Sequence, residues 1–157
     1  MPLVPTAGER RLLDPTLFTT IDSGGTASLR LAGSRCSSCA AVTFPAQSSC
    51  PRCTGEDVTI HALADHGTVW ASTVQRFTPK PPYLGAGGAP LPYAVGYVDL
   101  AGEVLVESRL VGPFERLQIG APVAMTLEEL PGADGEPVWT FAFAPADMVS
   151  ALSGAEG

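Results

Sequence analysis

Basic residues are scarce in this sequence of 157 residues, which has nine Lys and Arg against sixteen Asp and Glu and a formal net charge of −7. Proteins that bind nucleic-acid backbones need clustered cations, so this balance argues against that class. Long apolar runs are also lacking, because no stretch approaches the roughly eighteen residues of a membrane-spanning helix. The N-terminal stretch MPLVPTAGERRLLDP has no apolar segment of the kind found in secretory signals. We therefore expect a cytoplasmic protein.

Cysteine occurs only four times, and all four residues lie in RCSSCAAVTFPAQSSCPRC, residues 35–53. Cys36 and Cys39 form one Cys-x-x-Cys pair, and Cys50 and Cys53 form the other. In a reducing compartment, paired cysteines bind metal more often than they form disulfides. A tetrahedral Zn(II) site needs four donors about 2.3 Å from the metal, and two such turns joined by a short hairpin supply them. We predict a zinc ribbon with structural Zn(II), whose four thiolates leave no open position for a substrate.

Other interpretations of this window are two disulfides, a thioredoxin-like redox motif and four unrelated buried cysteines. The lack of an export signal disfavours disulfides, and no strand–helix unit follows the pairs as a redox motif would require. His61 and His66 lie eight and thirteen residues after Cys53 and are alternative metal ligands. Four cysteines already suffice, so we expect both histidines to be solvated or hydrogen-bonded locally.

Glycine and proline, at 17 and 15 residues, favour short strands joined by turns over long helices. Five strand-like segments follow the cysteine window, at residues 67–77, 93–100, 103–112, 123–130 and 138–144. Five short strands suggest a closed barrel, because closure removes exposed edges. The sequence therefore predicts an all-β chain in which an N-terminal zinc ribbon precedes a five-stranded OB-fold barrel. An OB-fold usually has a helix between its third and fourth strands. The corresponding segment here contains only PFERLQ, so we expect a short turn in place of the helix.

Four segments are expected along the chain. Residues 1–27 form an N-terminal arm or short helix, residues 28–63 the zinc ribbon, residues 64–146 the OB-fold, and residues 147–157 a flexible tail.

The last strand-like segment alternates with a period of two. Trp139, Phe141 and Phe143 share one face of it, and we expect that face to lie in the core. A base-stacking platform is the alternative, which the shortage of cations disfavours.

The segment TPKPPYLGAGGAPLP, residues 78–92, is long for a connection and contains five prolines and three glycines. Long loops in compact domains often carry function. We expect its apolar residues to contact a partner protein: Pro81, Pro82, Tyr83 and Leu84.

The ordered combination of motifs resembles one family, long described as a domain of unknown function, in which a rubredoxin-like zinc ribbon precedes an OB-fold. The resemblance covers about residues 28–146 and is carried by RCSSCAAVTFPAQSSCPRC, GTVWASTVQRF, PYAVGYVDLAGEVLVESRLVG and IGAPV. Near the N-terminus, DPTLFTTID only partly matches the helix that is usual in this family.

The resemblance implies a non-catalytic accessory subunit of a thiolase-like acyl-CoA enzyme, in a heteromer with two copies of each chain. Such enzymes make or break carbon–carbon bonds, as in thiolysis or the retro-aldol (aldolase) cleavage of a steroid side chain. The partner would carry the catalytic residues, and this chain would stabilise it and help to form the channel for coenzyme A and substrate. Expected contacts with coenzyme A or the partner are Arg35, Arg76, Lys80, Tyr83, Tyr93 and Arg109.

The residues themselves offer no nucleophile with an adjacent base and orienting group, which agrees with a chain that is not catalytic alone. The main alternative is a single-stranded nucleic-acid-binding module, since zinc ribbons and OB-folds both serve that role elsewhere. The acidic balance disfavours it. An independent enzyme is a weaker third hypothesis.

Overall fold

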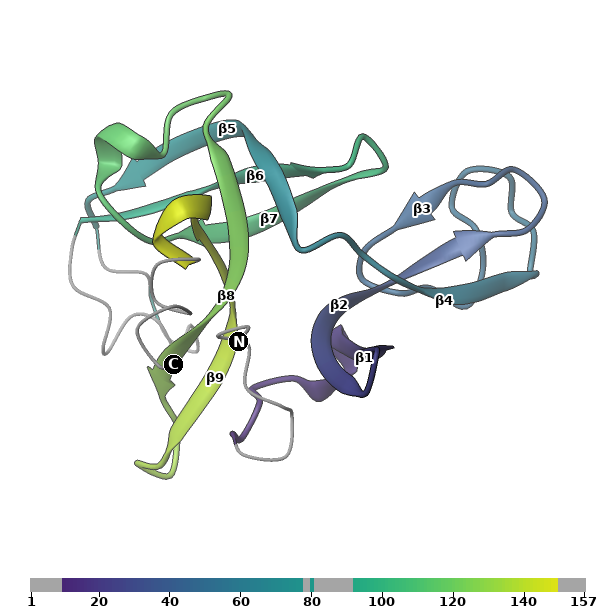
Figure 1. Cartoon of the computed structure of the whole chain (residues 1–157), viewed down its shortest axis with the longest axis horizontal. Coiled ribbons are helices and arrows are strands. Elements are labelled where there is room, and N and C mark those ends of the chain that lie inside the picture. The colour runs from purple at the N-terminus through teal and green to yellow at the C-terminus, as the bar shows by residue number, and fades with distance from the viewer. Residues whose placement is uncertain (1–9, 78–79, 81–91, 150–157) are drawn as a thin grey trace.

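A body that holds the cysteine window lies beside a β-barrel in the computed structural model (Figure 1). The structure describes residues 10–77, 80 and 92–149. In these ranges, no helix combines the length and apolar composition needed to cross a membrane.

The chain enters the fold through a β-hairpin. A single 3-10 turn, η1 (Pro15–Leu17), is capped by the Asp14 carboxylate and leads into β1 (Phe18–Ser23). β1 pairs antiparallel with the first half of β2 (Thr26–Cys36). The described part of residues 1–27, expected to be an arm or a short helix, is therefore one 3-10 turn followed mainly by extended chain.

The second half of β2 forms the ribbon sheet, pairing with both β3 (Val42–Thr43) and β4 (Val58–Ala62). Gly33 on β2 allows the close approach of these strands. A Cβ atom at that position would lie 2.7 Å from the Thr43 carbonyl oxygen and 2.8 Å from the side chain of Leu63. Any larger residue would therefore force the ribbon sheet away from the chain that enters the barrel.

Five strands close the barrel in the order β5-β6-β7-β9-β8. They are β5 (His66–Gln75), β6 (Tyr93–Leu100), β7 (Val104–Leu110), β8 (Pro122–Pro131) and β9 (Pro137–Pro145). Neighbouring strands run antiparallel except β7 and β9, which meet in a short parallel contact. The all-β fold and the closed five-stranded barrel are confirmed. The expected short turn is also present, as the 3-10 helix η3 (Phe114–Arg116) between β7 and β8.

The barrel and the ribbon share one hydrophobic core. Leu31 from β2 and Leu63, just after β4, are both 1% exposed and pack with the barrel interior. Their barrel neighbours in this cluster include Val69, Val98, Val106, Val123 and Phe143. Because apolar contacts continue from one body into the other, the two bodies stabilise each other.

The expected alternation along β9 is wrong for Trp139. Phe143 is buried in the core, and Phe141 packs edge-on against the rings of Phe18 and Phe44. Trp139, in contrast, is only partly buried and lies under the Arg10 guanidinium, 4.0 Å from the ring centroid. Val138 and Ala142, on the other face of the strand, are also buried. Both faces of β9 are covered, so burial does not follow the period of the strand.

Glu103, in the turn between β6 and β7, ties the barrel to the ribbon. Its carboxylate accepts a hydrogen bond from Arg35 Nη2 of β2 at 2.6 Å and lies 3.1 Å from His61 Nε2 of β4. The β6–β7 hairpin reaches from the barrel toward the ribbon (Figure 1). The hydrogen bond with His61 lowers the pKa of Glu103, partial desolvation opposes this shift, and Arg35 adds to the lowering.

We expect Glu103→Gln to weaken this tie and to reduce the acid dependence of stability. A carboxylate with a lowered folded-state pKa stabilises the fold above its unfolded value, about 4.3 for Glu, and loses that contribution as pH falls through the folded-state value. The loss at pH 7 should stay below about 1 kcal/mol, because both charged partners are partly exposed. Urea unfolding between pH 3 and 7 measures it.

The matched control is Glu107→Gln, which alters an exposed carboxylate on the same hairpin. If Glu103→Gln and Glu107→Gln give the same pH profile of unfolding free energy as the unaltered chain, Glu103 does not tie the two bodies.

Candidate metal centre

The first cysteine pair sits in a tight turn at the end of β2. The Cys36 N–H donates to the carbonyl of Ala41, and the Cys36 carbonyl accepts from the N–H of Ala40. These two bonds fold the backbone around the first sulfur. Ala40 has a φ of 61°, a left-handed conformation that is unusual for a residue with a Cβ.

The second cysteine pair repeats the same turn. The Cys50 N–H donates to the carbonyl of Gly55, and its carbonyl accepts from the N–H of Thr54, which has a φ of 65°. Each hydrogen bond spans the same number of residues as in the first turn. The Cys-x-x-Cys spacing therefore produces two equivalent loops that present their sulfurs toward each other.

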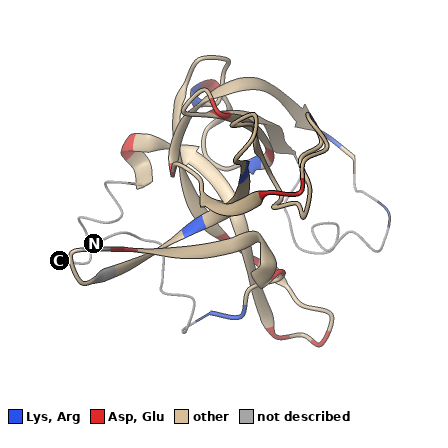
Figure 2. Ribbon diagram, turned by 90° about the vertical axis from the view of Figure 1, so that its right-hand side faces the viewer, with Lys and Arg blue, Asp and Glu red and all other residues tan. Residues whose placement is uncertain are grey.

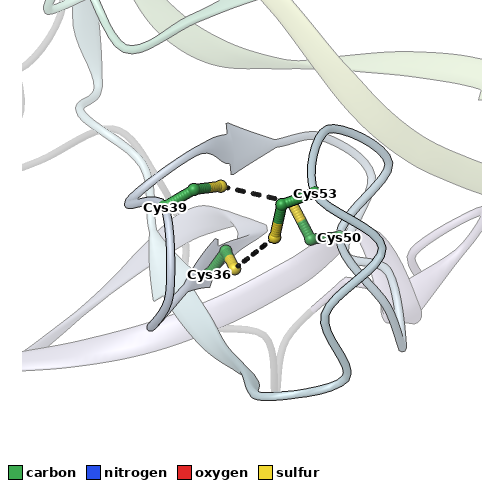
Figure 3. Close-up of side chains that lie close together, drawn as sticks. All are labelled: Cys36, Cys39, Cys50 and Cys53. Carbon is green, nitrogen blue, oxygen red and sulfur yellow. Dashed lines mark hydrogen bonds between the residues drawn. The ribbon is translucent and has the colours of Figure 1, made fainter.

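The four Sγ atoms all lie within 4.8 Å of one another (Figure 3). Cys36 and Cys53 sulfurs are 3.6 Å apart, as are those of Cys39 and Cys50. Tetrahedral Zn–S bonds of about 2.3 Å would separate the sulfurs by about 3.8 Å. A disulfide needs about 2.05 Å, and all four cysteines are free thiols. The donor set therefore fits a tetrahedral ion that prefers thiolate ligands.

Backbone N–H groups favour thiolates at the first cysteine of each pair. Hydrogen bonds from the N–H groups of Cys39 and Ser38 lower the pKa of Cys36 to about 6. The N–H of Cys53 likewise lowers the pKa of Cys50. The loop backbone thus directs partial positive charge at the sulfurs and prepares them for a cation.

Cys53 shows the opposite shift. Its Gly55 N–H contact lowers its pKa, but hydrogen bonds with the sulfurs of Cys36 and Cys39 raise it, for a net value of about 11. Four sulfurs this close cannot all ionise without a compensating positive charge. A bound divalent cation removes this conflict, because metal ligation deprotonates thiols.

Neither histidine joins the sulfur cluster. His61 lies near Glu103 and 3.2 Å from Arg35 Nη2, and His66 Nδ1 lies 2.8 Å from Asp65 Oδ1. The only His, Cys, Asp or Glu group with metal-binding geometry found in the described residues consists of the four cysteines. His66 thus has a local polar partner, as expected, whereas the polar partners of His61 lie on β2 and in the β6–β7 turn.

The described residues among the predicted contacts with coenzyme A or a partner lie on several elements of the fold. Arg35 is paired with Glu103, whereas Arg109 lies 4.8 Å from the Tyr93 ring centroid and is paired with Glu128. Arg76 and Lys80 are exposed. Tyr83 lies outside the described residues, as do Pro81, Pro82 and Leu84.

No sequence pattern indicated the largely buried ion pair between Arg109 and Glu128. The two side chains are 2.9 Å apart and 13% and 16% exposed, and burial raises the pKa of Glu128. Beside Glu128 is a cavity of about 350 Å³ lined mainly by apolar residues, including Val111, Leu127, Ala144 and Met148. In the run LEEL, Glu128 and Glu129 look alike, and only the fold separates the buried one from the exposed one.

Both bodies match described protein families. Residues 24–59 match the family described as "ChsH2, rubredoxin-like zinc ribbon domain", and residues 61–128 match "ChsH2, C-terminal OB-fold domain". The first match contains all four cysteines. The second begins in β4 and ends within β8.

Two relatives are similar over most of the chain. The chain is 27% identical over 114 residues to the benzoylsuccinyl-CoA thiolase subunit BbsA of Thauera aromatica, spanning 72% of this chain and 74% of that protein. Among solved structures, it is similar to a chain of the Ltp2-ChsH2(DUF35) aldolase, with a TM-score of 0.57 and 27% identity. That likeness covers 74% of this chain and 84% of the other.

We expect purified protein to hold one zinc ion per chain and Cys39→Ser to lose most of it, because three thiolates bind the ion less tightly than four. Metal analysis of both proteins measures this. Ser37→Ala, which changes an exposed neighbour, is the control and should keep the ion. Equal zinc in the Cys39→Ser protein would show that Cys39 is not a ligand.

Replacing the left-handed residues by glycine should strengthen the loops. A left-handed backbone conformation costs a residue with a Cβ about 1–2 kcal/mol. Glycine avoids this cost, but the greater conformational entropy of glycine in the unfolded chain offsets part of the gain. Ala40→Gly should therefore raise the free energy of unfolding by about 0.5 kcal/mol and slow zinc loss to a chelator. Ala41→Gly, where no left-handed φ is present, should instead destabilise. Equal destabilisation by both would show that Ala40 is not strained.

Proposed function

Because the chain belongs to the family in which a ChsH2-type rubredoxin-like zinc ribbon precedes an OB-fold, we propose that it is a non-catalytic accessory subunit of a thiolase-like acyl-CoA enzyme. The observation that carries this proposal is the similarity, across both bodies, to a protein named as a thiolase subunit. The similarity to a chain of an aldolase complex supports it. The partner would hold the reacting groups, and this chain would stabilise the partner.

Within this proposal, Cys36, Cys39, Cys50 and Cys53 hold one structural Zn(II) ion. The ion supplies positive charge that fixes the two loops and leaves no coordination position for a substrate. Residues 28–63 form the ribbon around it, and residues 64–146 form the barrel. The ribbon needs such an ion because a segment of this size buries too little apolar surface to fold alone.

The hydrogen bonds of the two histidines agree with a chain that leaves the chemistry to a partner. A nucleophile needs a base within hydrogen-bond distance. The side-chain partners of the two histidines are Arg35 and Glu103 for His61, and Asp65 for His66. None of these is a hydroxyl or a thiol, and the cysteines are gathered in the sulfur cluster. Carbon–carbon bond chemistry is therefore assigned to the partner.

We assign to this chain a share in the channel for coenzyme A. Its exposed cations Arg76 and Lys80 are the best candidates for phosphate contacts, because Arg35 and Arg109 already pair with carboxylates. Tyr93 is buried and packs with Arg109, so its ring is a weaker candidate for a ligand contact. Thiolysis and retro-aldol cleavage, including that of a steroid side chain, are the reactions proposed for the complex, which would contain two copies of each chain in the cytoplasm.

Co-expression tests this function. The chain, tagged and produced together with each thiolase-like enzyme encoded in its own genome, should copurify with one of them and raise its turnover of an acyl-CoA substrate. A biosynthetic thiolase from an unrelated organism serves as the control and should not copurify.

The nucleic-acid alternative predicts a different result. Basic positions are scattered over the described chain rather than gathered in one stripe (Figure 2). If the chain associates with none of the thiolase-like enzymes and instead retards single-stranded DNA at moderate salt, the accessory-subunit proposal is wrong.

A further inference from the structure

The barrel carries a patch of exposed hydrophobic side chains that its own fold does not use. The structure leaves seven large hydrophobic residues exposed among those it describes. Four of them lie on neighbouring elements of the barrel and are named here the aromatic patch: Trp70 (56% exposed), Tyr97 (42%), Leu105 (41%) and Ile119 (74%).

Strand pairing brings the first three together. The rings of Trp70 and Tyr97 meet edge-on, with centroids 6.3 Å apart and planes at 88°. An irregularity in β5 between Val69 and Ala71 accommodates Trp70 beside β6. On β7, Leu105 lies diagonally across from Tyr97 on the same face of the sheet, within reach of an aromatic ring.

The turn before β8 adds Ile119. The Gly120 N–H donates to the Val69 carbonyl, and the Val69 N–H donates to the carbonyl of Ala121. These two bonds hold the turn against β5 at the residue before Trp70. The patch therefore extends over β5, β6, β7 and this turn, all of which are fixed by backbone hydrogen bonds.

Such a patch is characteristic of a binding surface. Single exposed hydrophobic residues are common on proteins, but contiguous ones mark interaction sites. Tryptophan and tyrosine are also the residues that most often dominate the energy of an interface. Because hydrogen-bonded strands carry these side chains, the loss of conformational entropy on binding would be small.

Charges around the patch favour a basic occupant. Glu107 is directly opposite Tyr97, and Asp99 is directly opposite Leu105, so acidic groups flank the apolar surface. A second copy of this chain, packed about a two-fold axis, would bring these carboxylates together, and its net charge of −7 adds to the repulsion. A phosphate backbone is disfavoured for the same reason.

We propose that the aromatic patch docks onto the thiolase-like partner subunit, at an apolar hollow of that subunit flanked by Lys and Arg. This inference rests on the function proposed above and adds the surface and the charge of the partner site. Trp70 and Tyr97 fill the hollow, and Glu107 pairs with a cation at its edge.

The test uses the full chain and the thiolase-like subunit that copurifies with it. Trp70→Ala should raise the dissociation constant of the complex at least about 10-fold, as expected for an aromatic anchor. Tyr97→Ala is a second variant in case the first folds poorly. Glu107→Lys should also weaken binding, because it places a cation against the basic edge. Titration calorimetry at fixed salt gives the dissociation constants.

Ile60→Ala is the matched control, since Ile60 is 63% exposed but lies on ribbon strand β4, outside the patch. It should leave the dissociation constant unchanged. Circular dichroism and zinc content establish that each variant is folded.

The outcomes separate the two proposals. If the unaltered chain binds the thiolase-like subunit and the correctly folded Trp70→Ala and Tyr97→Ala variants bind it equally well, the patch proposal is wrong and the proposed function stands. If the unaltered chain binds no thiolase-like subunit, both are wrong. If light scattering shows that Trp70→Ala converts a dimer of this chain into monomers without changing partner binding, the patch joins two copies of the chain.

Discussion

The structure depends on four sulfur atoms that the backbone holds within 4.8 Å of one another. Two equivalent loops position them, and backbone N–H groups directed at the sulfurs compensate part of their charge. The remaining conflict appears at Cys53, whose pKa rises to about 11. A bound divalent cation would resolve it and would add to the small apolar area that so short a ribbon can bury. The two cysteine loops at the far end of the ribbon therefore depend on this centre.

Strand β2 carries that order from the ribbon into the barrel. It holds Cys36 at one end and Leu31, a member of the barrel core cluster, five residues earlier. Between them, Gly33 lets the ribbon sheet approach Leu63, and Arg35 reaches Glu103 on the β6–β7 turn. Apolar packing and a hydrogen-bonded ion pair thus join the two bodies at separate points. An accessory subunit built in this way presents a nearly fixed surface to its partner, which lowers the entropic cost of assembly.

Features that depend on local pattern could be predicted from the sequence. The cysteine loops, the strand at residues 93–100 and the short turn near Phe114 are all determined by neighbouring residues. Features that depend on residues far apart in the chain could not be predicted. Arg35 looked like a free cation, but its partner Glu103 lies 68 residues further on. Trp139 followed a clean alternation, yet the segment before β1 pairs with β9 at that point, with Leu12 bridged to Trp139. Glu128 and Glu129 cannot be told apart in the sequence, because only the barrel fold buries Glu128 beside Arg109.

The sulfur cluster also changes the electrostatic character of the whole molecule. Four thiolates around one Zn²⁺ would carry a net charge of −2, and the formal net charge of −7 does not count the cysteines, so the zinc-bound chain would carry about −9. A more negative subunit collides more productively with an oppositely charged one, because long-range attraction orients the two before contact. Toward the basic partner site proposed above, metal loading would therefore accelerate the encounter step as well as order the ribbon, and this acceleration would fade as ionic strength rises.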